Sequence, residues 1–202
     1  MSIRMPVRRM RGSQPGFTLA ETMIAIIISA LIVVGSLMLM GHLVTVSVNA
    51  RNDTLAILNL QYAGFWVSED AIQAQAIGNL TDPRDPKGVG MGNVTETGFP
   101  LAIQWTEWDG DINHVTYTMG NMTDDLDRRL WRLERTHWLK PHNKNWEDHG
   151  MVIVAEYLCP ETTRCYWDDP SDKDLLTLEV TTKVDLNEAS NTYKISPRAF
   201  AN

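Results

Sequence analysis

The feature that most constrains this chain is a long uncharged stretch near its N-terminus. Residues 22–50 contain no Asp, Glu, Lys or Arg, and most of them are apolar. About 20 apolar residues in a helix are enough to cross the ~30 Å hydrocarbon core of a bilayer. The stretch therefore predicts one membrane-spanning helix and argues against a purely cytoplasmic globular protein.

The charges on either side of this stretch set its expected orientation. Residues 1–16 contain four arginines and no acidic residue, whereas the whole chain has 18 basic and 25 acidic residues and a net charge of −7. Positive residues that flank a membrane helix stay on the cytoplasmic side. We therefore expect a single-pass membrane protein with a cytoplasmic N-terminus and an extracytoplasmic body. The arginines are Arg4, Arg8, Arg9 and Arg11.

A removable secretory signal peptide is the alternative reading of the same stretch. Such a peptide has an apolar core of about 7–15 residues followed by a cleavage site of small residues. Here the apolar core is far longer, and the nearest small-residue site, Val48-Asn49-Ala50, comes too late. The length of the stretch favours a helix that the protein keeps.

The junction between the basic segment and the apolar stretch reads Gly16-Phe17-Thr18-Leu19-Ala20-Glu21. It resembles the prepilin signal of type IV pilins and type II secretion pseudopilins, in which the pattern G-F-[ST]-L-x-E opens a long apolar helix. The resemblance implies cleavage after Gly16 by a prepilin peptidase on the cytoplasmic side, followed by N-methylation of Phe17. It also implies that the apolar helix stays with the mature protein.

Glu21 lies one turn into the predicted membrane helix. A carboxylate at such a depth costs about 2.5–3.5 kcal/mol on insertion scales, so a charge there is a functional hypothesis by default. After cleavage the ammonium of Phe17 would lie close to Glu21, and a neighbouring subunit would supply the same pair. We therefore expect Glu21 to act in assembly. The alternative is a carboxylate that merely reaches the membrane interface.

These observations divide the chain into three predicted segments. Residues 1–16 are a basic prepilin leader, and residues 17–50 are a transmembrane and filament-core helix. Residues 51–202 are an extracytoplasmic pilin globular domain, made of an amphipathic helix and a β-sheet.

The helix is expected to run from about residue 17 to 77, since no proline occurs between Phe17 and Asp82. After residue 50 its apolar residues recur at a spacing near 3.6, which predicts that this outer half packs one face into the body. Gly78 and the Pro- and Gly-rich residues 82–90 then predict a loop. The predicted packing stripe is Leu55, Leu58, Tyr62, Phe65, Trp66, Ile72 and Ala76.

Short strand-like runs follow the loop, and a long helix before short strands is an α+β pattern. Two of the runs, 114–119 and 129–136, flank a polar turn and predict an antiparallel hairpin. The pattern therefore predicts the α+β class, and the prepilin resemblance implies a type IV pilin-like fold, with the outer half of the helix packed on an antiparallel sheet. The other runs are 101–105, 151–157, 175–184 and a short one at 193–196.

The body also resembles the PilW and PulJ group of minor pilins and pseudopilins. The resemblance rests on the helix segment WVSEDAIQA at 66–74, on HVTYTM at 114–119 with RRLWRLERT at 128–136, and on the closing SPRAFAN at 196–202. In that group an acidic segment lies late in the helix, and a Tyr-containing strand leads to an L-x-R strand.

Cys159 and Cys165 are the two cysteines of the chain, in the segment Cys-Pro-Glu-Thr-Thr-Arg-Cys. Two cysteines in an oxidising compartment predict one disulfide, which here would staple a turn. A metal pair would need two further ligands at suitable spacing, and the sequence places none nearby.

Two other polar clusters contain side chains that can bind metals, and neither carries a recognised metal-binding signature. Residues 137–149 hold three histidines with Glu147 and Asp148, but they lack an H-E-x-x-H motif and suggest an irregular exposed loop. Residues 168–174 hold four aspartates but lack the glycine and final glutamate of an EF-hand. We therefore expect no metal site and no cofactor. The histidines are His137, His142 and His149.

The sequence thus predicts a structural protein and not an enzyme, since no catalytic triad, phosphate loop or catalytic cysteine stands out. The predicted function is that of a minor pilin or pseudopilin that assembles into a type IV pilus or a type II secretion pseudopilus, in an initiation or tip complex. Expected partners are other subunits, the prepilin peptidase, the inner-membrane assembly platform and the lipid bilayer.

The sequence is also compatible with two rival functions. One is a helix-anchored extracytoplasmic enzyme or metal-binding protein that uses the 137–149 region. The other keeps the family but assigns DNA uptake or adhesion at a pilus tip. The acidic body would repel phosphate, so direct binding of nucleic acid is not expected.

Overall fold

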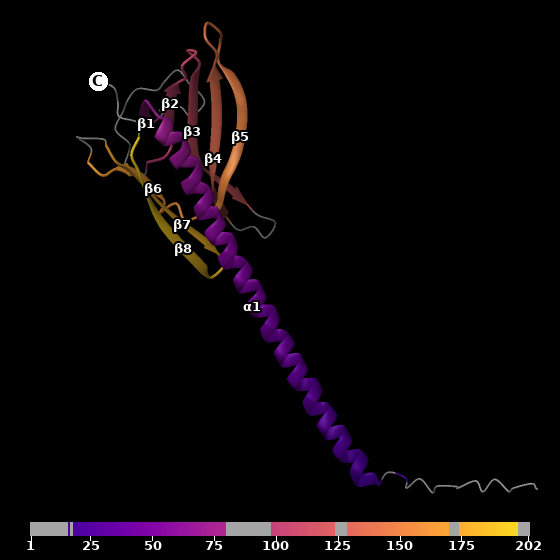
Figure 1. Cartoon of the computed structure of the whole chain (residues 1–202). Helices are drawn as coiled ribbons and strands as arrows, with labels where there is room; N and C mark the ends of the chain where they lie inside the picture. Colours follow the sequence, from indigo (N-terminus) through magenta and orange to yellow (C-terminus); the bar gives the residue numbers. More distant parts are fainter. Residues whose placement is uncertain (1–15, 17, 80–97, 124–128, 170–173, 198–202) are drawn as a thin grey trace, which may run out of the picture. The chain divides into compact units, whose positions relative to one another are not determined.

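The computed structural model describes residues 16, 18–79, 98–123, 129–169 and 174–197 (Figure 1). The chain divides into two compact units, residues 1–47 and 48–202. One helix, α1 (Leu19–Gln73), is followed by eight strands in a single antiparallel sheet. The predicted α+β, type IV pilin-like class is therefore confirmed.

The part of α1 in the first unit, residues 19–47, is built for an apolar environment. It contains no proline, and the hydroxyls of three of its residues, Thr22, Ser36 and Thr45, bond back to helix carbonyls. Ser36 Oγ donates to the carbonyl of Ile32 (2.8 Å), and Thr45 Oγ1 donates to the carbonyl of Gly41 (3.0 Å). Such bonds give a hydroxyl donor an acceptor in surroundings that contain no water. Among the described residues, α1 is the one helix long and apolar enough to cross a membrane.

The helix ends earlier than the sequence predicts. It stops at Gln73, and residues expected to form its last turn are instead strand β1 (Ala76–Asn79). The backbone N–H of Gln75 donates to the carbonyl of Gln104 (2.9 Å), and its side-chain amide both donates to and accepts from the backbone of Thr106. Backbone pairing with a strand that is distant in the sequence therefore replaces the last predicted turn of the helix.

The strand order is β1-β2-β3-β4-β5-β7-β6, with β8 paired to β7. The predicted hairpin is confirmed as β3 and β4, and it is longer than expected, since pairing runs from Ile112 with Lys140 to Thr123 with Arg129. The other bounds of the sheet are β2 (Leu101–Thr106), β3 (Ile112–Thr123), β4 (Arg129–Lys140), β5 (Glu147–Leu158), β6 (Arg164–Trp167), β7 (Leu176–Val184) and β8 (Asn187–Ile195).

The outer half of α1 packs on the sheet, but not through the predicted stripe. The buried side chains of α1 are mostly small, and they recur on one side of the helix. Several large residues of the predicted stripe are instead exposed. Small residues let the helix backbone approach the sheet closely, as the contact between Gly64 and the Tyr193 ring shows: a Cβ on Gly64 would lie 2.2 Å from the ring. The buried residues are Ala56, Leu60, Ala63, Gly64, Val67, Asp70 and Ala71.

The large side chains of this interface come from the sheet, and the closely packed helix buries them. Polar contacts fix the docking: the hydroxyl of Tyr193 donates to the carbonyl of Leu60 (2.9 Å), and Thr182 Oγ1 donates to the carbonyl of Ala56 (3.1 Å). The core is therefore formed by small helix residues against large strand residues. The most deeply buried large side chains of the strands are Leu101, Ile103, Tyr117, Leu133, Leu176 and Leu178.

Candidate functional site

The motif residues Thr18 and Glu21 form a reciprocal cap at the start of α1. Glu21 Oε2 accepts from the backbone N–H of Thr18 (2.9 Å) and from its hydroxyl (3.0 Å), while the N–H of Glu21 donates to Thr18 Oγ1 (3.3 Å). This is a capping box, which satisfies N–H groups that have no partner inside the helix. The spacing T-x-x-E was visible in the sequence but was not interpreted in this way.

The proposed cleavage site lies directly before this cap. Gly16 is exposed, and no atom lies within 4 Å of where a Cβ would stand. Phe17 and the basic leader, residues 1–15, lie outside the described residues. The roles predicted for Gly16, Phe17 and Glu21 therefore remain predictions.

After the cap, α1 presents apolar side chains on all sides. The large apolar residues between Leu19 and Val46 are each 49–81% exposed. Monomeric soluble proteins rarely expose apolar patches of more than a few hundred Å². Such exposure is typical of a helix that lipid or other protein chains cover.

A second apolar surface lies on the outer half of α1, within the body unit. Four large residues, at steps of 4, 3 and 7, are 39–59% exposed, and we call them the outer stripe. Phe65 also contacts Trp66 edge-to-face, with ring centroids 6.0 Å apart. The outer stripe consists of Leu58, Tyr62, Phe65 and Ile72.

A buried ion pair fastens the end of α1 to strands β3 and β4. Asp70 is 4% exposed and accepts two bonds from Arg135, from Nε to Oδ2 (2.7 Å) and from Nη2 to Oδ1 (2.9 Å). The hydroxyl of Tyr117 also donates to Asp70, and the guanidinium of Arg135 lies over the Trp66 ring, 4.9 Å from its centroid. We call Asp70, Arg135, Tyr117 and Trp66 the anchor cluster.

The charges of the anchor cluster support one another. Burial, followed by the negative charge of Asp70, raises the pKa of the Tyr117 hydroxyl, so that it stays protonated and donates. Burial alone would lower the pKa of Arg135, but its hydrogen bonds to Asp70 and the charge of that carboxylate raise it on balance. The geometry is that of a structural tie between helix and sheet.

Of the three histidines in residues 137–149, two lie side by side and the third lies in a turn. His137 lies in β4 and His149 in β5, so the predicted irregular loop is wrong at these positions, and their ring centroids are 5.3 Å apart. His137 Nε2 bonds to Asn113 Oδ1 (2.9 Å). His142 lies in the turn, where its backbone N–H donates to Asp111 (2.7 Å). Among the described residues, no group of three or more His, Cys, Asp or Glu side chains could hold a metal ion.

The aspartates weighed as a calcium site are only partly described, because residues 170–173 lie outside the described ranges. Within them, Asp168 accepts from Thr177 Oγ1 and from Lys194 Nζ (3.0 Å). These hydrogen bonds, with that of Thr177 the stronger cause, lower the pKa of Asp168. Its carboxylate is thus engaged in joining the segment after β6 to β7 and β8.

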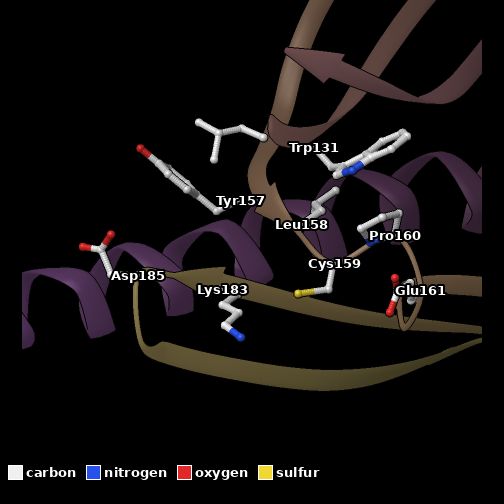
Figure 2. A pocket seen from close by; sticks show the side chains of 9 residues that line it. Trp131, Tyr157, Leu158, Cys159, Pro160, Glu161, Lys183 and Asp185 are labelled. Atoms are coloured by element: carbon white, nitrogen blue, oxygen red, sulfur yellow. The ribbon is translucent and has the colours of Figure 1, made fainter. Parts of the chain in front are cut away.

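Cys159 and Cys165 lie in different surroundings, and their sulfur atoms are not bonded to each other in this structure. Cys165 is part of the core, and burial raises its pKa to about 12. Cys159 is half-buried and lines a cavity of about 370 Å³, where burial and then Glu188 raise its pKa. Figure 2 shows Cys159 there, with Trp131 and Lys183 among its neighbours. The disulfide between the two cysteines stays a prediction.

Comparison with known proteins identifies a motif in the N-terminal segment. A family model described as a prokaryotic N-terminal methylation motif matches residues 11–37. The chain carries a pilin-type methylation motif. The match covers the capped start of α1 and supports the type IV pilin and pseudopilin class. No curated protein and no solved structure matches the chain.

Proposed function

We propose that this protein is a structural minor pilin or pseudopilin of the PilW and PulJ type. It is cleaved after Gly16, N-methylated on Phe17, and assembled through residues 17–50 into a type IV pilus or a type II secretion pseudopilus. Residues 1–16 are the leader, and residues 51–202 form the extracytoplasmic body. The observation that carries the proposal is the methylation motif at residues 11–37, followed directly by a helix with exposed apolar side chains on all sides.

The energetics of the exposed helix favour assembly. Each large apolar side chain left in water forgoes about 1.5–3 kcal/mol relative to full burial. In the membrane, lipid covers these side chains; in a filament, helices of neighbouring subunits take the place of the lipid. An apolar surface on every side of residues 19–46 suits both states.

The outer stripe extends the surface available to neighbouring subunits. Leu58, Tyr62, Phe65 and Ile72 belong to the same helix but to the body unit, where the sheet leaves them uncovered. Aromatic residues are enriched in protein interfaces, and two of the four are aromatic. We therefore place the outer stripe in the contacts that hold the subunit in an initiation or tip complex, built on the inner-membrane assembly platform.

Glu21 has a free atom for the pairing that assembly requires. Both bonds from Thr18 reach Oε2, and among the described residues none donates to Oε1. A carboxylate oxygen accepts two hydrogen bonds, so the methylated ammonium of a neighbouring Phe17 can bind Oε1 while the cap stays intact. Glu21 then caps its own helix through Oε2 and binds the neighbouring subunit through Oε1.

Intact-mass measurement of protein extracted from native membranes tests the processing step. The expected mass is that of a chain beginning at N-methylated Phe17. Gly16→Val should leave the leader attached, because a branched side chain replaces the minimal one in the extended segment that the peptidase must hold. Gly35→Val is the matched control, since Gly35 also has open space around it, and it should be processed normally. A wild-type chain that keeps residues 1–16 in the mature pool overturns the proposal.

A further inference from the structure

Strand β5 has one paired edge and one open edge along most of its length. One edge pairs with β4, while the other pairs with β7 only where Leu158 meets Thr182. Figure 1 shows β5 at the outer edge of the sheet, beside β4. Along residues 147–157, no strand among the described residues pairs with the second edge. An open edge is a row of backbone N–H and C=O groups that can bond another strand.

Local structure closes this edge at both ends. Near its start, Gly150 has a left-handed conformation (φ 93°), its N–H donates to Asp148 Oδ1 (2.7 Å), and the pairing with β4 shifts register between Asp148 and Met151. Near its end, the N–H of Glu156 donates to Asn59 Oδ1 (2.9 Å) and is already used. The open edge is therefore limited to residues 151–155.

The side chains of this segment are unusual for an exposed edge. Its five residues are all apolar, and the first three are 43–52% exposed. Natural proteins protect open edges with lysine, proline or an inward-pointing charge, and residues 151–155 contain none of these. Three consecutive exposed apolar residues in a strand indicate a binding surface. The residues are Met151, Val152, Ile153, Val154 and Ala155.

We propose that the open edge of β5, residues 151–155, accepts an extended segment of a second polypeptide by β-strand addition. The segment has a run of about five β-branched residues, mostly apolar, flanked by lysine or arginine. Backbone bonds to β5 supply the affinity, and side chains on both faces supply the specificity. This proposal stands on the body unit alone and does not depend on how the N-terminus is processed.

The charges at the two ends of the edge identify this partner. When two copies of β5 pair antiparallel about Ile153, Glu156 of each copy faces Gly150 of the other and lies diagonal to its Asp148. Such diagonal neighbours are about 7–8 Å apart, and like charges across strands are destabilising. A strand with basic residues at both ends would instead place a positive charge near Asp148 and another near Glu156, and both contacts would be attractive. The acidic ends of the edge therefore disfavour a second copy of this chain and favour a basic partner.

Binding of two matched peptides to the full chain in detergent micelles tests the proposal. The probes are fluorescent acetyl-KVTITVK-amide and its counterpart acetyl-EVTITVE-amide, with empty micelles as the blank. Because each end changes from attraction to repulsion, the lysine peptide should bind about tenfold more tightly. It should also slow amide hydrogen exchange in residues 151–155 by about tenfold, since exchange of a bonded amide requires opening.

Two variants separate this edge from a general apolar surface. Val152→Lys places a positive charge in the middle of the edge and should weaken binding of the lysine peptide by at least about tenfold. Leu186→Lys is the matched control, since Leu186 is 93% exposed in the turn between β7 and β8, and it should change binding less than about twofold.

Three results would overturn the proposal. The first is equal affinity of the wild-type chain for the two peptides, and the second is unchanged hydrogen exchange in residues 151–155 when the lysine peptide is bound. The third is a disulfide between two copies of an Ile153→Cys variant when the chain is oxidised in the absence of peptide, which would make a second copy the occupant. The exchange measurement uses the wild-type chain, so it is decisive even if Val152→Lys does not fold.

Discussion

The two parts of α1 differ in which of their side chains they bury and which they expose. Residues 19–47 carry large apolar side chains on every side and bury none of them within the chain. Residues 48–73 turn small side chains toward the sheet and leave large ones exposed. The difference teaches that side-chain size, and not hydrophobicity alone, chooses the face on which a helix packs. A Gly or Ala face allows a close approach that a Leu or Phe face would prevent.

The largest expected effect comes from breaking the anchor cluster, which only the outer part of α1 has. Asp70→Ala leaves the guanidinium of Arg135 buried without its carboxylate, and loss of one partner of a buried pair costs about 3–5 kcal/mol. Denaturant unfolding of the full chain in detergent, followed by tryptophan fluorescence, measures this loss. All seven tryptophans of the chain lie beyond residue 50, so the signal reports on the body.

Two controls show whether the buried charge is the cause. Glu69→Ala removes the neighbouring but exposed carboxylate and should change the free energy of unfolding by no more than about 0.5 kcal/mol. Combining Asp70→Ala with Arg135→Met should recover part of the loss, because apolar replacement of a whole buried pair is often neutral. If Asp70→Ala is no worse than Glu69→Ala, the cluster does not hold the helix to the sheet.

The next effect compares the same substitution in the two parts of the helix. Gly64→Ala places a Cβ 2.2 Å from the ring of Tyr193, and such overpacking costs about 1–3 kcal/mol. Gly41→Ala meets nothing within 4 Å and gains up to about 1 kcal/mol of helix propensity. Denaturant unfolding should therefore show a less stable body for Gly64→Ala only. Equal midpoints for the two variants would mean that the helix does not rest on Tyr193 as described.

Sequence patterns predicted the parts of the fold that depend on local information. The long helix followed from an apolar run without proline, and the β3–β4 hairpin followed from two strand-like runs around a polar turn. The capping box was equally local, since Thr18 and Glu21 are three residues apart, and attention to that spacing would have found it.

The errors concern contacts between residues far apart in the sequence. The helix stops before Gln75 because the backbone of Gln75 bonds to that of Gln104. No sequence pattern around Gln75 predicts this partner. Asp70 is buried because Arg135, 65 residues later, neutralises it, and nothing next to Asp70 in the sequence points to that arginine. Phe65 and its neighbours were assigned to the core because periodicity identifies an apolar face without showing what covers it.

The outer stripe offers a smaller effect on stability and a clear effect on association. Phe65→Ser changes a side chain that is 59% exposed, so the free energy of unfolding of the body should change by no more than about 0.5 kcal/mol. Co-purification with other filament subunits from native membranes should fall, because the apolar contact is lost. Leu60→Ser, at a position 5% exposed, is the contrasting variant and should destabilise the body by about 2 kcal/mol or more. Undiminished co-purification of Phe65→Ser would remove the stripe from the interface.

The smallest expected effect on the body comes from Glu21, at the opposite end of α1 from the anchor cluster. About 49 residues of helix at ~1.5 Å each separate Glu21 from Asp70. Glu21→Gln should therefore leave the denaturant midpoint of the body unchanged. Gln also serves in a capping box, so the start of α1 should keep its cap. What the variant loses is the negative charge that attracts the Phe17 ammonium of a neighbouring subunit.

This loss should appear in assembly alone. Glu21→Gln should accumulate in the membrane and be cleaved normally, yet be depleted from sheared filaments or from co-purified subunit complexes. Thr18→Ala provides the reverse control: it weakens the cap by about 0.5–2 kcal/mol but keeps the carboxylate, so it should still enter assemblies. If Glu21→Gln assembles at wild-type stoichiometry while Thr18→Ala does not, Glu21 acts only as a helix cap. Charge pairing would then play no part in joining the subunits.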